Sequence, residues 1–152
     1  MELSAHFSLE EFTASDQAIA LKIDNSPTPE HLKNLRHLAD RMEAVRAIFN
    51  VSIQITSAYR NPQLNAAVKG VPTSAHALGH AADFHVAGLA DLEAAKRIRD
   101  SGLEFDQLIY EKGRCVHISF DPRPTATPPG MRGEVLSQPG GPLTKCFPGL
   151  QP

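Results

Sequence analysis

The sequence lacks the features of a membrane protein or a nucleic-acid-binding protein. No apolar run approaches the ~20 residues that a transmembrane helix needs, so no stable membrane insertion is expected. The formal net charge is only −2, which excludes a strong electrostatic attraction to nucleic acid or to an anionic membrane surface. The N-terminus has neither a basic segment nor an apolar one after it. We therefore expect a chain made in the cytoplasm without a signal peptide.

Cysteine is also scarce, because Cys115 and Cys146 are the only two in 152 residues. Their spacing fits no C-x-x-C metal or redox motif. The prediction is therefore two free thiols, and a single disulfide stays open as the alternative. The length is typical of one domain that is large enough to bury a core, and we expect a monomer.

Two helix starts can be recognised from their capping residues. Ser8 and Glu11 stand three positions apart, as in a capping box, and predict a short helix there. Thr28 can cap a second helix, with Pro29 at its first position. This second helix is predicted to be long and amphipathic, because apolar residues recur at steps of three and four: Leu32, Leu35, Leu38, Met42, Val45 and Ile48.

The rest of the chain mixes strands with shorter helices. Alternation predicts a strand over 51–57, small residues suggest another over 81–86, and 105–111 with 115–120 form a predicted hairpin. Helical turns are expected over 63–68 and a helix over 89–100. This order predicts an α+β fold with a small, mostly antiparallel sheet flanked by helices. Residues 1–121 would form the domain. The Pro- and Gly-rich residues 122–152 would form a tail packed on it or partly disordered.

A histidine and an aspartate, His76 and Asp83, stand seven positions apart, and Gly79 between them allows a tight backbone turn. His117 lies within the predicted strand 115–120, where its side chain should point away from its apolar neighbours. Two imidazoles and a carboxylate are a common way to hold a catalytic zinc with one coordination position open.

Two other histidines compete with this interpretation. His76 and His80 have helical metal-motif spacing, but Gly79 stands between them and no glutamate follows His76, so the H-E-x-x-H signature is absent. His85 shares a strand face with Asp83 and could line the site without binding metal.

Taken together, these residues resemble a known family. The zinc D-alanyl-D-alanine peptidases of the M15 type have a similar order of motifs, and the small phage and prophage members begin with a similar His-Phe-Ser-Leu-x-Glu-Phe segment. The resemblance runs from about His6 to Asp121 and leaves the tail uncovered. It is carried by His6–Phe12, Ser57–Arg60, Asn65, Ser74–His76, Gly79, Ala81–Asp83 and Val116–His117.

The resemblance implies a fold like that of the DD-peptidases and hedgehog proteins, with a zinc peptidase domain over residues 1–121. It makes His76, Asp83 and His117 the Zn²⁺ ligands. It makes Arg60 the group that binds the terminal carboxylate of the substrate, which suits a planar guanidinium. A structural salt bridge is the alternative role for Arg60. Ser74 would hydrogen-bond substrate or orient the loop that carries His76.

The general base is the position where this chain departs from the family. Members frequently have an acid three positions before the last zinc histidine, and this chain has Arg114 there. Lys112, five positions before His117, is an unsuitable base unless it is buried. Glu111 is therefore the predicted base, with Asp106 as the weaker second choice.

The hairpin register supports Glu111. If residues 112–114 form a three-residue loop, Glu111 pairs with Cys115 and Ile109 pairs with His117. Glu111 and His117 then project from one face of the sheet, whereas a slip of one residue would reverse this. Cys115 is itself a departure, since the family has an aromatic residue there.

The resemblance thus implies a zinc peptidase that hydrolyses peptidoglycan stem peptides at or near D-Ala, as a carboxypeptidase or an endopeptidase. Its site of action would be the cell wall, the periplasm or a phage particle. Two alternatives remain: a non-catalytic zinc-binding structural component of a phage, favoured by the missing acid at Arg114, and a binding module that retains only the fold.

Overall fold

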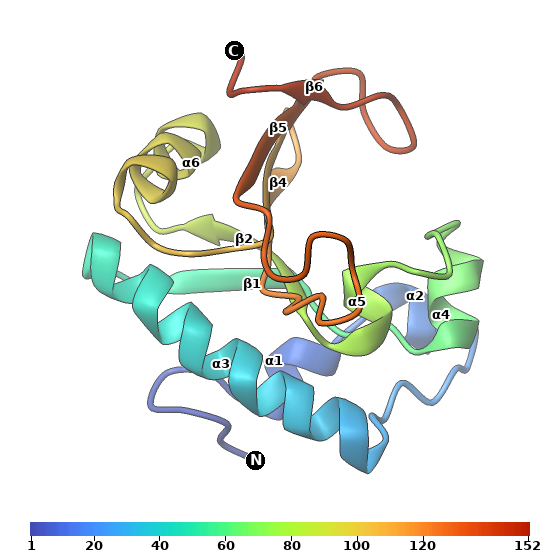
Figure 1. Ribbon diagram of the computed structural model, residues 1–152. Helices are drawn as coiled ribbons and strands as arrows, with labels where there is room; N and C mark the ends of the chain where they lie inside the picture. Colours follow the sequence, from blue (N-terminus) through green and yellow to red (C-terminus); the bar gives the residue numbers. More distant parts are fainter.

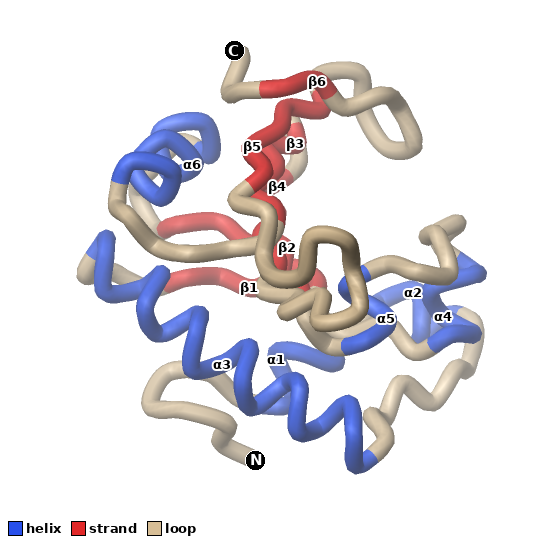
Figure 2. The backbone as a smooth tube through the Cα atoms, viewed as in Figure 1, coloured by secondary structure: helices blue, strands red, loops and turns tan.

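The computed structural model describes residues 1–152 and shows an α+β fold (Figures 1 and 2). The helices are α1 (Leu9–Thr13), α2 (Asp16–Ala20), α3 (Pro29–Phe49), α4 (Pro62–Ala67), α5 (Ala75–Leu78) and α6 (Asp91–Asp100). The strands are β1 (Ile53–Ser57), β2 (Ala81–Val86), β3 (Gln107–Glu111), β4 (Cys115–Ser119), β5 (Glu134–Gln138) and β6 (Phe147–Pro148).

The strands form one six-stranded sheet in the order β1-β2-β4-β3-β5-β6. Every neighbouring pair is antiparallel except β3 and β5, which run parallel. The prediction of an α+β fold with a mostly antiparallel sheet is confirmed.

The two predicted helix starts are both present. Ser8 and Glu11 form the reciprocal capping box of α1. Thr28 caps α3 by accepting a hydrogen bond from the backbone N–H of His31, and Pro29 takes the first turn. Helix α3 is 21 residues long and ends at Asn50 in the left-handed conformation. None of the helices combines the length and the apolar character that crossing a bilayer requires.

The sheet separates a buried core from an open face. Helix α6 packs on β2, β3 and β4, and apolar residues of α3 join the same core cluster. The inward side chains include Phe84, Leu108, Val116 and Ile118, all of which are fully buried. Because successive side chains of a strand point to opposite faces, Asp83 and His117 are directed to the other side of the sheet.

The C-terminal segment, residues 122–152, is more regular than its sequence suggests. The Pro- and Gly-rich tail gives no sign of a strand, but residues 134–138 form β5, which is paired in parallel with β3. Arg132 anchors the start of this strand through its backbone N–H and its guanidinium, both of which donate to the Asp106 carboxylate. β3 would otherwise present an unpaired edge, which β5 covers.

Two short helices were also missed by the sequence analysis. α2 and α5 have 5 and 4 residues, too few to show a helical period. Each is started by a serine whose hydroxyl accepts a backbone N–H, Ser15 for α2 and Ser74 for α5.

Candidate metal centre

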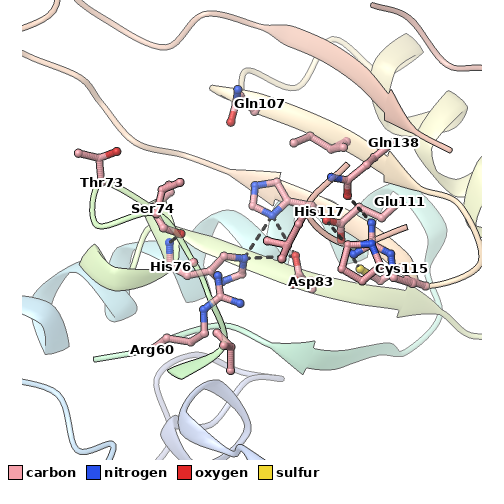
Figure 3. Close-up of a pocket in the computed structure, with 18 of the residues that line it drawn as sticks. Arg60, Thr73, Ser74, His76, Asp83, Gln107, Glu111, Cys115, His117 and Gln138 are labelled. Carbon is pink, nitrogen blue, oxygen red and sulfur yellow. Dashed lines mark hydrogen bonds and ion pairs between the residues drawn. The ribbon is translucent and has the colours of Figure 1, made fainter. Parts of the chain in front are cut away.

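A cleft of about 670 Å³ opens on the face of the sheet opposite the core. This volume is in the range typical of ligand sites. Its floor is made by β2, β3 and β4, and its walls come from the segment between α4 and α5 and from the C-terminal segment. All the predicted site residues line this cleft: Arg60, Ser74, His76, Asp83, Glu111 and His117. Figure 3 shows how they lie.

His76 is held in place by α5 and by the backbone below it. The Ser74 hydroxyl caps α5 by accepting the N–H of His76, so Ser74 orients the turn that carries this histidine. The ring Nδ1 of His76 lies 2.6 Å from the carbonyl oxygen of Ala58. A carbonyl only accepts, so Nδ1 carries a proton and, in the neutral ring, Nε2 presents its lone pair to the cleft. Metal-bound histidines commonly donate their other ring N–H to a carbonyl oxygen in this way.

Asp83 and His117 are directly opposite each other on β2 and β4. The His117 Nδ1 lies 2.9 Å from Asp83 Oδ1. The Nε2 of His76 lies 3.3 Å from that nitrogen and 3.3 Å from the Asp83 oxygen. Three donor atoms therefore form a small triangle, drawn with dashed lines in Figure 3.

The triangle has the dimensions of a zinc site. Ligands at about 2.0 Å from a tetrahedral Zn²⁺ are about 3.3 Å from one another. Two of the three sides match this edge, and the third is 0.4 Å shorter, the difference between the 3.3 and 2.9 Å distances. The residues present therefore fit a metal ion bound on three sides, with the fourth open to the cleft.

Electrostatics favour a charged carboxylate at this point. Burial acts to raise the pKa of Asp83, but the charge of His76 and the hydrogen bond from His117 outweigh it, and the pKa falls well below its usual range. Burial likewise acts to lower the pKa of His117, and Asp83 outweighs this and raises it. Asp83 is thus an anion between two imidazoles, and a cation bound by the Nδ1 of His117 would displace the proton through which this nitrogen now bonds Asp83.

The β3–β4 hairpin has the predicted register. Glu111 pairs with Cys115, and Ile109 with His117. The Glu111 carboxylate and the His117 ring consequently face the same cleft. One oxygen of Glu111 lies within 4.8 Å of a carboxylate oxygen of Asp83, so Glu111 stands beside the metal ligands.

Cys115 contacts the predicted base, Glu111. Its Sγ donates to Glu111 Oε2 at 2.7 Å. Burial, and then the negative charges of Asp83 and Glu111, raise the pKa of Cys115, so the thiol keeps its proton. Cys115 and Cys146 are both free, as predicted.

Arg114 forms an ion pair with Glu111 and a hydrogen bond to the C-terminal segment. Its guanidinium lies 3.7 Å from Glu111 Oε1 and donates to the side-chain oxygen of Gln138 on β5. Gln138 lines the cleft and was missed by the sequence analysis, because no local pattern marks a strand so close to prolines. Gln138 of the C-terminal segment thus contacts Arg114, and Arg114 in turn pairs with the predicted base Glu111.

Arg60 is directed into the cleft without a protein partner for its charge. It forms no ion pair, and its Nε is buried and makes no hydrogen bond. Burial lowers its pKa from its usual value, although Asp83 and Glu111 act in the opposite direction. The structural salt bridge considered as an alternative is therefore absent, and Figure 3 places Arg60 beside His76.

Three other candidates from the sequence are less suited to the metal site or to the base. Asp106 is buried and bonded to Arg132, which leaves it poorly suited to act as a base. His85 does not line the cleft, because its Nδ1 contacts Asp91 of α6 at 2.8 Å. His80 is outside the groups of side chains that could share a metal ion.

The three donor atoms at the floor of the cleft could hold a metal ion, in the way that the sites of metallopeptidases do. The family model of Peptidase M15 matches residues 5–119 of the 152-residue chain. The chain therefore belongs to the Peptidase M15 family and is a peptidase of a generally metal-dependent kind. No curated protein matches it.

Proposed function

We propose that this protein is a zinc-dependent peptidase that hydrolyses peptidoglycan stem peptides at or near D-Ala. The observation that carries the proposal is the triangle of donor atoms from His76, Asp83 and His117, with sides of 2.9 to 3.3 Å at the floor of a cleft. This donor set is the two-imidazole, one-carboxylate set of catalytic zinc sites. The substrate class follows the resemblance described above.

In this proposal His76, Asp83 and His117 hold the Zn²⁺. A zinc ion at such a site polarises a carbonyl and lowers the pKa of bound water. Glu111 takes the proton of the attacking water and returns it to the leaving amine. A carboxylate oxygen of Glu111 lies within 4.8 Å of one of Asp83, so the base is next to the proposed ligand set. Arg114 and Cys115 hold the Glu111 side chain toward the cleft.

Arg60 positions the substrate. A guanidinium that has no partner within the protein is free to bind a carboxylate by donating two parallel hydrogen bonds to it. This role suits a carboxypeptidase, whose substrate ends at the residue after the cut. Ser74 acts indirectly, by orienting the turn that carries His76.

The experiment that tests the proposal is digestion of purified sacculi by the zinc-loaded protein, with products identified by mass spectrometry. Release of D-Ala identifies a carboxypeptidase, and separated cross-linked stems identify an endopeptidase. Both should stop when zinc is removed and return when it is restored. Zinc binding without any product would contradict the enzymatic proposal and favour the non-catalytic structural protein.

A further inference from the structure

The mouth of the cleft carries large apolar side chains that the fold does not need. Leu143 is 70% exposed and Val71 is 63% exposed, yet both line the same cleft as the metal ligands. Leu143 belongs to the β5–β6 loop, and Val71 belongs to the α4–α5 loop. Both loops lie on the right-hand side of Figure 1, with the β5–β6 loop above.

Leu143 is held in an unfavourable backbone conformation. Thr144 N donates to Gly141 O across a turn with Pro142 second and Leu143 third. The φ angle of Leu143 is +63°, in the left-handed region. The third position of such a turn is normally glycine or asparagine, because a side chain there is strained. A leucine that is strained and also exposed lowers stability, which suggests a role outside folding.

The Leu143 turn is fixed to the sheet rather than loose. Gln138 Nε2 donates to the carbonyl of Thr144, and the Thr144 hydroxyl donates to Gly141 O. The oxygen of the same Gln138 side chain accepts from Arg114, which lies beside Glu111. The loop therefore presents Leu143 in a position set by the site itself.

The Val71 side is fixed in a comparable way. The buried amide of Asn65 donates from Nδ2 to Val71 O, and the Gly70 N–H donates to Asn65 O. A Cβ at Gly70 would lie 2.1 Å from Asn65 Oδ1, so only glycine lets this loop close on the asparagine. Both apolar tips are thus pre-positioned, which lowers the entropy lost when they bind a ligand.

We infer that Leu143 and Val71 form an apolar subsite for the part of the peptide substrate that lies away from the scissile bond. This inference rests on the proposed function. Leu143 and Val71 line the same cleft as the proposed metal ligands, so the occupant would be another part of the same peptide. The matching groups on a stem peptide are alanine methyls and the alkyl arm of its diamino acid. Val71 lies within the family-matched residues 5–119 and Leu143 lies outside them, so the subsite would join the two regions of the chain.

The test compares two substrates and two leucines. Leu143→Gly removes the side chain and also relieves the positive φ. A synthetic stem pentapeptide ending in D-Ala-D-Ala reaches the subsite, whereas N-acetyl-D-Ala-D-Ala is too short. For Leu143→Gly we expect KM on the pentapeptide to rise about tenfold with kcat unchanged, the loss expected for part of a leucine's burial. KM on the short substrate should not change, and the melting temperature should stay equal or rise.

Leu21→Gly is the matched control, because Leu21 is 49% exposed and lies outside the cleft, and both KM values should stay at the wild-type level. Val71→Ser should repeat the selective loss on the pentapeptide. An active enzyme whose pentapeptide KM is unaltered in Leu143→Gly overturns the subsite and leaves the proposed function standing. A wild-type protein that neither cleaves nor binds either peptide overturns both.

Discussion

Two regions build the cleft, and they contribute different things. Residues 5–119, which the family matches, carry every proposed ligand together with Arg60 and Glu111. The C-terminal segment carries none of these, yet it adds Gln138, Pro142 and Leu143 to the cleft wall. The groups proposed to carry out the reaction therefore lie in the first region, whereas the second forms part of the cleft wall that the substrate would contact.

The second region is attached through a few strong contacts. β5 extends the sheet by pairing with β3, and Arg132 bonds the buried Asp106. Substitutions of the proposed site residues in the first region should therefore abolish zinc binding, lower kcat or raise KM. Substitutions in the second region should change the stability of the protein or its affinity for substrate.

The largest effect is expected for His117→Ala. Removing one of three ligands should abolish tight zinc binding and with it the stabilisation that a bound ion gives to the native state. Metal analysis should find no zinc after dialysis, and thermal unfolding should occur at a lower temperature than for the zinc-loaded wild type. His80→Ala is the matched control and should keep its zinc. Full zinc occupancy in His117→Ala would refute the ligand assignment.

The next effect is expected for Glu111→Gln. Glutamine preserves size but cannot take a proton, and general acid–base catalysis is typically worth about 10²–10⁴-fold, so kcat should fall within that range. Zinc content and melting temperature should not change. The control is Glu104→Gln, since Glu104 is exposed outside the cleft. Near-normal activity in Glu111→Gln would pass the role of base to another group.

A smaller effect is expected for Arg60→Lys. An ammonium group cannot reproduce two parallel hydrogen bonds to a carboxylate, so KM for a stem peptide with a free C-terminus should rise about tenfold. Zinc content should stay constant. Arg97→Lys, on the exposed face of α6, should leave KM unchanged. If KM is the same in Arg60→Lys, Arg60 does not bind the terminal carboxylate.

The smallest effect is expected where the two regions join. Burial acts to raise the pKa of Asp106, but the hydrogen bonds from Arg132 outweigh it, so the folded pKa is lowered. A lowered carboxylate pKa adds stability above the unfolded value, about 3.9, and that stability disappears as the pH falls through the folded value. Arg132→Leu should therefore cost about 1–2 kcal/mol at pH 7, a discounted figure because Arg132 is 39% exposed.

The control for this last prediction is pH itself. The stability difference between wild type and Arg132→Leu, measured by denaturant unfolding, should shrink as the pH falls below about 4. A difference that stays constant from pH 7 to the acid range would show that the contribution of Arg132 does not depend on the charge of Asp106.

Much of the fold could be predicted because its signals are local. The capping residues Ser8 and Thr28 mark two helix starts, and strand β2 has the predicted bounds. The three-residue loop between β3 and β4 sets their register, so the pairing of Glu111 with Cys115 also followed from the sequence. In each case the chain positions that decide the structure are close together.

What the sequence alone determined is the set of chemical groups: two imidazoles, one carboxylate, an arginine and a nearby glutamate, in an order typical of the family. Which of these groups are free to act depends on their contacts in the folded chain. Arg132 binds Asp106, Asp91 binds His85, and Gln138 binds Arg114. Strand β5 belongs to the same class of result, because it pairs with β3 across a long stretch of chain. Such contacts follow from packing between distant segments, and no local spacing in the sequence encodes them.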